Sequence, residues 1–187
     1  MKYLITGLGN PGEEYAHTRH NIGFEVLDAL AKVSNTSFKD KRYGFISDFR
    51  YKSRTFHLLK PTTYVNLSGR AVNYYLRKHK IPLEHLLVVV DDLALPFGKL
   101  RLRARGGDAG HNGLINITQV MGTHQFPRLR FGIGNDFPKG TQVDYVLGKW
   151  TQEEADELPE KIDLACDIIR SFATIGIEHT MNRFNKN

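Results

Sequence analysis

Residues 4–24, LITGLGNPGEEYAHTRHNIGF, decide the fold because an apolar run, a glycine-rich turn and the start of a helix follow one another within them. The apolar run predicts a short buried strand over residues 3–6 that ends at Gly7, and helical spacing of apolar side chains begins near Ile22. Glycines allow the backbone of the turn to approach a ligand closely. Because ligands bind at the carboxyl ends of strands in open α/β sheets, the polar side chains that follow are candidates for chemistry. These are Asn10, His17, His20 and Asn21.

The turn GLGNPG at residues 7–12 also matches the G-x-G-x-x-G pattern of dinucleotide sites. That pattern needs a helix that begins within the motif, and an acidic residue about 20 positions later at the end of a second strand. Here the helical spacing begins only near Ile22, and Asp28 falls inside that helix. A turn that requires glycines explains the motif better than a dinucleotide site does.

Composition sets the outer limits. A chain of 187 residues with 41% hydrophobic and 25% charged residues is typical of one globular domain, here residues 1–187. The absence of a basic-then-apolar leader and of a membrane-spanning apolar run predicts a cytoplasmic protein without a membrane partner. The single cysteine, Cys166, lies in an apolar helical stretch and is expected to serve packing. A formal charge of +6 suits a polyanionic partner, although such an excess also serves solubility alone.

Patterns along the rest of the chain predict alternating strands and helices, and hence an α/β fold with a mixed sheet. Residues 43–51 and 55–60 suggest a hairpin, and residues 86–90, 128–134 and 143–147 suggest further strands. Helices are predicted from about residue 71, from residues 111–113, over residues 159–175 and in the tail 177–187. Asn66 or Ser68 could cap the first of these, and Thr151 with Glu154 forms a capping-box pattern.

Two segments contain charged side chains that could take part in a functional site. Asp91 and Asp92 end the apolar run at residues 86–90 and should point to opposite faces, so at most one is expected to face a given site. Such a carboxylate can orient a histidine or cap a loop, and the sequence favours neither role.

Residues 99–105 alternate basic and apolar side chains, which predicts an edge strand whose charged face is either solvated or binds phosphate. The glycines before His111 add free backbone N–H groups at a helix start.

Polar side chains at the predicted strand ends and loops form one set, namely Asn10, His20, Asn66, Asp91 and Asn112. The sequence contains no G-x-S-x-G elbow, no activated cysteine, and no histidine pair with a glutamate at zinc-binding spacing, so water remains as the nucleophile. A histidine can take a proton from water while an aspartate fixes its tautomer, and amide N–H groups can stabilise an oxyanion. For Asn66, a helix cap is an equal interpretation.

Four ordered motifs resemble those of bacterial-type peptidyl-tRNA hydrolases, and the resemblance extends over essentially the whole chain. The motifs are GLGNPG at residues 7–12 with Tyr15 and TRHN at 18–21, PTTYVNLSG at 61–69, Asp91-Asp92 with Leu95-Pro96, and GHNGL at 110–114. The resemblance implies a single α/β domain with a mixed twisted sheet sandwiched between helices. It also implies hydrolysis of the ester between a peptide and the 3′-terminal ribose of tRNA, without a cofactor or a metal.

Carried over by position, the resemblance makes His20 the general base and Asp91 its orienting acid, with Asn10 as the third catalytic residue. Substrate binding would fall to Tyr15, Tyr64, Asn66 and Asn112. Arg103 and Arg130 would contact tRNA phosphates. The implied partner is peptidyl-tRNA, recognised at its acceptor stem and terminal adenosine by a monomeric enzyme.

The chain departs from the family pattern in its glycine loop, where Asp108 and Ala109 stand. A noncatalytic RNA-binding protein of the same fold is the alternative. Retention of Asn10, His20, Asp91 and Asn112 favours the enzyme.

Overall fold

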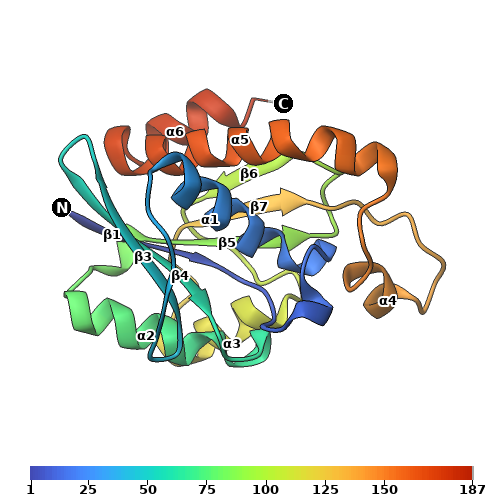
Figure 1. The fold of residues 1–187 in the computed structure, drawn as a ribbon, viewed down its shortest axis with the longest axis horizontal. Coiled ribbons are helices and arrows are strands. Elements are labelled where there is room, and N and C mark those ends of the chain that lie inside the picture. Colours follow the sequence, from blue (N-terminus) through green and yellow to red (C-terminus); the bar gives the residue numbers. More distant parts are fainter. Residues whose placement is uncertain (187) are drawn as a thin grey trace.

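The computed structural model describes residues 1–186 as a seven-stranded sheet with helices on both faces (Figure 1). The strands are β1 (Lys2–Gly7), β2 (Lys39–Lys41), β3 (Gly44–Tyr51), β4 (Arg54–Pro61), β5 (Leu86–Asp92), β6 (Leu100–Arg103) and β7 (Arg128–Gly132). Their order is β2-β3-β4-β1-β5-β7-β6. The four central strands β4, β1, β5 and β7 are parallel, whereas β2, β3 and β6 pair antiparallel at the edges. The predicted mixed sheet is therefore confirmed.

The helices form two layers around this sheet. They are α1 (Ile22–Val33), α2 (Ser68–His79), α3 (Asn112–Met121), α4 (Gln142–Val146), α5 (Gln152–Ile175) and α6 (Ile177–Phe184). In Figure 1, α1, α5 and α6 cover one face, α2 and α3 cover the other, and α4 lies at the end toward which the central strands point. Within residues 1–186, no helix combines the length and the apolar character needed to cross a membrane.

Alternation along the central strands supplies a hydrophobic core on each face. In β5, Leu87 and Val89 pack toward α1 and α5, while Val88 and Val90 pack toward α2 and α3. Burial on both faces explains why this strand is a continuous apolar run. Cys166 is buried in the first of the two cores, where burial raises the pKa of its thiol to about 12, so the expected packing role is confirmed.

Two local predictions are confirmed by backbone geometry. The strands β3 and β4 form the expected hairpin, joined by Lys52 and Ser53 with φ angles of 47° and 65°. Positive φ at both central residues matches the twist of the flanking strands. At the start of α5, the Thr151 hydroxyl accepts from the Glu154 N–H, and the Glu154 carboxylate accepts from the Thr151 N–H.

The predicted cap of α2 is wrong. The N-cap position belongs to Leu67, whose side chain makes no capping hydrogen bond, and the Gly69 N–H in the first turn donates to Asn116 Oδ1 of α3 at 2.7 Å. The Ser68 hydroxyl instead donates to the Val65 carbonyl at 2.6 Å, within the short 3₁₀ turn Val65–Leu67 that precedes the helix. Asn66 is exposed, which leaves its amide free for another role.

The strand predicted at residues 143–147 is also wrong, because this segment forms α4. A short run rich in β-branched residues does not by itself distinguish a strand from a helix. Tertiary contacts decide the outcome here. The Tyr145 hydroxyl donates to the Ile133 carbonyl at 2.6 Å, and the Arg19 guanidinium lies 4.1 Å from the centre of the Tyr145 ring. Val143 is exposed, so the segment has no second apolar face to bury in a sheet.

The predicted tail helix ends earlier than expected. The helix α6 covers Ile177–Phe184, and Asn187 lies outside the described residues.

Candidate active site

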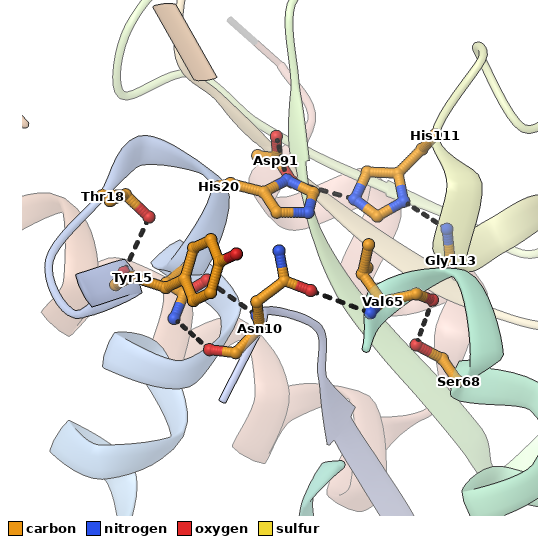
Figure 2. Close-up of polar contacts among 10 residues, drawn as sticks. Asn10, Tyr15, Thr18, His20, Val65, Ser68, Asp91, His111 and Gly113 are labelled. Carbon is orange, nitrogen blue, oxygen red and sulfur yellow. Dashed lines mark hydrogen bonds and ion pairs between the residues drawn. The ribbon is translucent and has the colours of Figure 1, made fainter. Parts of the chain in front are cut away.

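His20, Asp91 and His111 meet at the carboxyl end of the central sheet (Figure 2). His20 lies in the 3₁₀ turn Arg19–Asn21 before α1, Asp91 lies near the end of β5, and His111 is the N-cap of α3. The Nδ1 atom of His20 is 3.2 Å from a carboxylate oxygen of Asp91, and Nε2 of His111 is 2.9 Å from Oδ1 of the same carboxylate. One buried carboxylate thus holds two imidazoles, whose ring centres are 5.2 Å apart.

Close packing of glycines places the turn that carries His20. A Cβ atom added to Gly7 would lie 2.2 Å from the Gly23 carbonyl oxygen, so only glycine lets the first turn of α1 rest against the end of β1. The turn Arg19–Asn21 immediately precedes this contact and contacts β5. The glycine in the opening motif therefore serves the approach of one backbone to another, not a dinucleotide.

Hydrogen bonds assign different tautomers to the two histidines. His111 Nδ1 accepts from the Gly113 N–H at 3.1 Å, so its proton is on Nε2 and is donated to Asp91. His20 donates Nδ1–H to Asp91, which leaves its Nε2 unprotonated. Of the two rings, only His20 has a nitrogen free to accept a proton from water.

The electrostatics suit a base held by a carboxylate. Burial by itself would lower the pKa of His20, but the negative charge of Asp91 and its hydrogen bond outweigh burial and raise the pKa above the ordinary value. Burial would raise the pKa of Asp91, but His111 and His20 together hold it well below its ordinary value. Asp91 is therefore ionised at neutral pH and can stabilise an imidazolium on His20.

Asn10 is fixed beside this pair by contacts to its backbone and its side chain. Its N–H donates to Asn21 Oδ1 and its carbonyl accepts from Asn21 Nδ2, both at 2.9 Å. Its Oδ1 accepts from the Val65 N–H at 2.9 Å, which leaves the amide NH₂ group as a free donor. Figure 2 shows this NH₂ group pointing toward the His20 ring.

The paired aspartates divide the two roles that the sequence left open. Asp91 orients the histidines, while Oδ1 of Asp92 accepts from the Ala94 N–H at 2.8 Å and so caps the following loop. Both aspartates line the same cavity of about 430 Å³, contrary to the expectation that at most one would face the site. The reason is that β5 ends at Asp92, so the alternation of a continuing strand no longer applies.

The remaining predicted substrate residues are distributed around this centre. Asn112 lines the cavity at the first position of α3. Tyr15 is half-buried on the loop between Asn10 and His20, where its carbonyl accepts from the Thr18 hydroxyl at 2.8 Å (Figure 2). Tyr64 and Asn66 are both exposed next to the Val65 contact with Asn10, and neither lines the cavity.

The two arginines predicted to contact phosphates differ in their surroundings. Arg103 is exposed on the edge strand β6. Arg130 is half-buried on β7 directly opposite Arg101, and it lines the cavity. It donates to the Gly107 carbonyl at 2.7 Å and lies 3.4 Å from an Asp92 oxygen. Arg130 therefore has fewer free donors for a phosphate than Arg103.

The sequence did not predict the contacts of two residues of this centre, His111 and the candidate Asn21. Both lie within the motifs already quoted, one at a helix start and one beside His20. Their partners, Asp91 and Asn10, lie 20 and 11 positions away in the chain, and no local pattern connects residues at those distances.

The ligand atoms of His20, Asp91 and His111 also lie within 4.8 Å of one another, close enough to surround a metal ion. However, the nitrogens that face Asp91 carry the protons of the hydrogen bonds described above. Both would have to lose those protons to bind a cation. The donor set thus fits hydrogen bonding better than metal coordination.

An imidazole oriented by a buried carboxylate, beside a fixed asparagine amide, supplies the groups that hydrolysis by water requires. Among the described residues that line the cavity, no serine or cysteine is available as a nucleophile. This is the arrangement of a general-base hydrolase.

Comparison with known proteins identifies the family. The sequence model of the family described as peptidyl-tRNA hydrolase matches residues 4–187. Proteins named peptidyl-tRNA hydrolase from Phocaeicola vulgatus and Bacteroides fragilis are 61% and 58% identical, with 100% of each chain covered. The crystal structure of peptidyl-tRNA hydrolase from Acinetobacter baumannii matches with a TM-score of 0.92 at 35% identity, covering 98% of this chain and 94% of that one. The chain belongs to the peptidyl-tRNA hydrolase family.

Proposed function

We propose that this chain hydrolyses the ester between a peptide and the 3′-terminal ribose of tRNA, with His20 as the general base. The family supports the reaction, and the contact between His20 and Asp91 carries the mechanism. This contact directs the proton of His20 to Nδ1 and leaves Nε2 to accept a proton from water. The family match supports the hydrolase over a noncatalytic RNA-binding protein.

In the first step, Nε2 of His20 takes a proton from water as the water oxygen attacks the ester carbonyl. The carbonyl oxygen gains the negative charge, and the free NH₂ group of Asn10 is the donor placed to stabilise it. Asp91 remains ionised and stabilises the imidazolium. In the second step, the C–O bond to the ribose breaks and His20 returns the proton to the 3′ oxygen. The products are the peptide acid and free tRNA.

The direct test is release of peptide from N-blocked aminoacyl-tRNA by the purified protein. We expect release without an added cofactor, and at an unchanged rate in EDTA because the hydrogen bonds in the histidine cluster disfavour a metal. Unblocked aminoacyl-tRNA serves as the comparison substrate. Absence of release from the N-blocked substrate would contradict the proposed reaction.

Substrate selectivity gives a prediction for Asn10. A peptide bond next to the scissile ester offers an amide to the Asn10 side chain, whereas a free aminoacyl group offers a charged ammonium. We therefore expect Asn10→Ala to narrow the preference for N-blocked over free aminoacyl-tRNA, measured as the ratio of the two kcat/KM values. An equal loss on both substrates would leave Asn10 with only the oxyanion role described above, or a role in the fold, and none in recognition.

The cavity walls suggest how the rest of the substrate is bound. Asn112 lies in the cavity beside His111, and Tyr15 lies on the loop before His20. Tyr64 and Asn66 are exposed on the other side of Asn10, where the terminal adenosine or the peptide could reach them. We assign all four to substrate binding.

Arg103 and Arg130 are proposed to bind phosphates of the acceptor stem, which gives a second prediction. The double variant Arg103→Ala/Arg130→Ala should raise KM for full-length substrate and flatten its salt dependence. Each lost phosphate contact removes roughly 0.7 to 0.9 from the log–log slope. A short substrate that ends in the terminal adenosine should be hydrolysed as before. Equal losses on long and short substrates with an unchanged slope would place these arginines in the active site or the fold.

The chain is further proposed to act as one domain over residues 1–187 and as a monomer in the cytoplasm, where translation produces peptidyl-tRNA. Its own helices cover both faces of the sheet, which supports a self-sufficient unit. Sedimentation at working concentration tests the monomer, and a dimer would contradict it.

A further inference from the structure

One long segment of the chain carries basic side chains and no acidic ones. Residues 49–83 contain eight of the 26 lysines and arginines and none of the 20 acidic residues. The remaining residues hold 18 basic and 20 acidic side chains, a formal charge of −2. Residues 49–83 therefore contribute +8 to the formal charge, and they lie outside the basic strand β6.

Within this segment, α2 separates its charge from its apolar side chains. One side of the helix is buried against the sheet and α3, including Ala71, Val72 and Tyr75. On the opposite side, the residues from Arg70 to Lys78 that line a groove are three or four positions apart, so they share one face of the helix. The groove beside this stripe is open and has a volume of about 590 Å³. The groove is lined by Tyr43, Arg70, Asn73, Tyr74, Arg77, Lys78 and Val120.

The cations of this groove have no acidic partners. In the part of the chain that the structure describes, Arg70, Arg77 and Lys78 form no ion pair, whereas Lys60 and Arg170 are each paired with an aspartate. Lys78 helps to lower the pKa of Asp48, but that carboxylate is already bonded to His57 at 2.7 Å. Unpaired like charges repel, and a bound polyanion relieves that repulsion.

Aromatic rings accompany the cations at the rim of the groove. Tyr43 and Tyr74 meet edge to face with their ring centres 5.4 Å apart. The Arg42 guanidinium lies over both rings, at 5.3 Å and 5.6 Å from their centres, and adds a fourth cation. Cations mixed with ring surfaces are typical of sites that bind the backbone and bases of single-stranded nucleic acid.

We propose that this α2 groove is a second RNA-binding surface, which binds the phosphate backbone of a single-stranded RNA segment. It is separate from the proposed acceptor-stem site. The helix α2 packs on β1 and β4. Arg103 and Arg130 lie on β6 and β7, which form the other edge of the sheet beyond β5. The stripe from Arg70 to Lys78 spans about 12 Å at 1.5 Å per residue, which is long enough for more than one phosphate.

Binding of a fluorescent, unstructured oligoribonucleotide of about 12 nucleotides tests the proposal, with anisotropy measured over a range of salt concentrations. A 3′-phosphate on this RNA removes the free terminal ribose that the catalytic site would take. The double variant Arg77→Ala/Lys78→Ala should bind more weakly and reduce the salt slope by about 1.4, at roughly 0.7 per phosphate contact with single strands. Amide NMR shifts on titration should map to residues 70–78.

The matched control is Lys32→Ala/Arg183→Ala, which removes two exposed cations from α1 and α6 and should leave the slope unchanged. Hydrolysis of a short substrate by the Arg77→Ala/Lys78→Ala variant should keep its rate, which separates this surface from the proposed active site. An unchanged slope in that variant, or shifts confined to residues 103–112, would overturn the proposal. Equal competition by a polyglutamate peptide would also overturn it, in favour of an acidic protein partner.

Discussion

Replacing His20 by alanine should lower kcat by about 10²- to 10⁴-fold, the usual contribution of a general base. The loss is expected because His20 alone in the cluster has a free, unprotonated nitrogen. Binding of uncleaved tRNA should change little, since proton transfer acts only in the transition state. Single-turnover release of peptide measures the first quantity, and tRNA binding at equilibrium measures the second.

His111→Ala is the informative comparison for His20→Ala. His111 donates to Asp91 but has its other nitrogen occupied by the Gly113 N–H. Its loss should slow the reaction less than the loss of His20, since it removes support for Asp91 and not the base itself. A larger effect at His111 than at His20 would reverse the assignment of the base.

The pH dependence should report the same contact. The active form needs neutral His20, and Asp91 raises the pKa of His20 despite burial. The acidic limb of kcat/KM, which reports the free enzyme, should therefore lie above the ordinary histidine value of about 6.5. In Asp91→Asn the negative charge is gone while burial remains, so the limb should move to lower pH and the maximum rate should fall. If the limb lay at the same pH in both proteins, His20 would not be the group whose titration is observed.

Sequence periodicity was sufficient for most of the fold, because burial on one or both faces leaves a pattern that can be recognised locally. The run at residues 86–90 predicted β5, and apolar spacing from Ile22 predicted α1. The segment at residues 143–147 failed because its structure depends on Arg19, more than 120 positions away. The predicted cap at Asn66 failed for a related reason, since the turn before α2 is held by contacts with Asn10.

The site was predictable as a set of residues but not as a geometry. The motifs named His20, Asp91 and Asn10, yet the choice between an orienting and a capping aspartate depended on which side chains stood opposite. The contact between His20 and Asp91 joins residues 71 positions apart. The alternation at residues 99–105 marked one basic segment, but residues 49–83, with eight basic and no acidic side chains, have no such regular pattern and were not recognised as a second one.

The loop that leads to His111 depends on a buried arginine. Arg128 is completely buried, and burial lowers its pKa to about 10, so it is still charged at neutral pH. Its guanidinium donates to the carbonyls of Gly106 and Gly107 at 2.9 Å and 3.0 Å, and to that of His124. In residues 1–186, no carboxylate forms an ion pair with it, and backbone carbonyls accept all of its hydrogen bonds.

Arg128→Ala should therefore be the most destabilising of these substitutions, by about 3 to 5 kcal/mol in the free energy of unfolding. It opens a cavity and leaves several buried carbonyls without donors. Arg128→Lys should recover only part of the loss, because an ammonium is a point charge that does not reproduce the planar fork of donors. The control is Arg103→Ala, which removes the exposed arginine opposite Arg128 in the β6–β7 ladder and should cost less than about 0.5 kcal/mol. Urea unfolding measures all three variants. Similar costs for Arg128→Ala and Arg103→Ala would show that the carbonyl contacts contribute little, and that the glycine loop is held in place by other interactions.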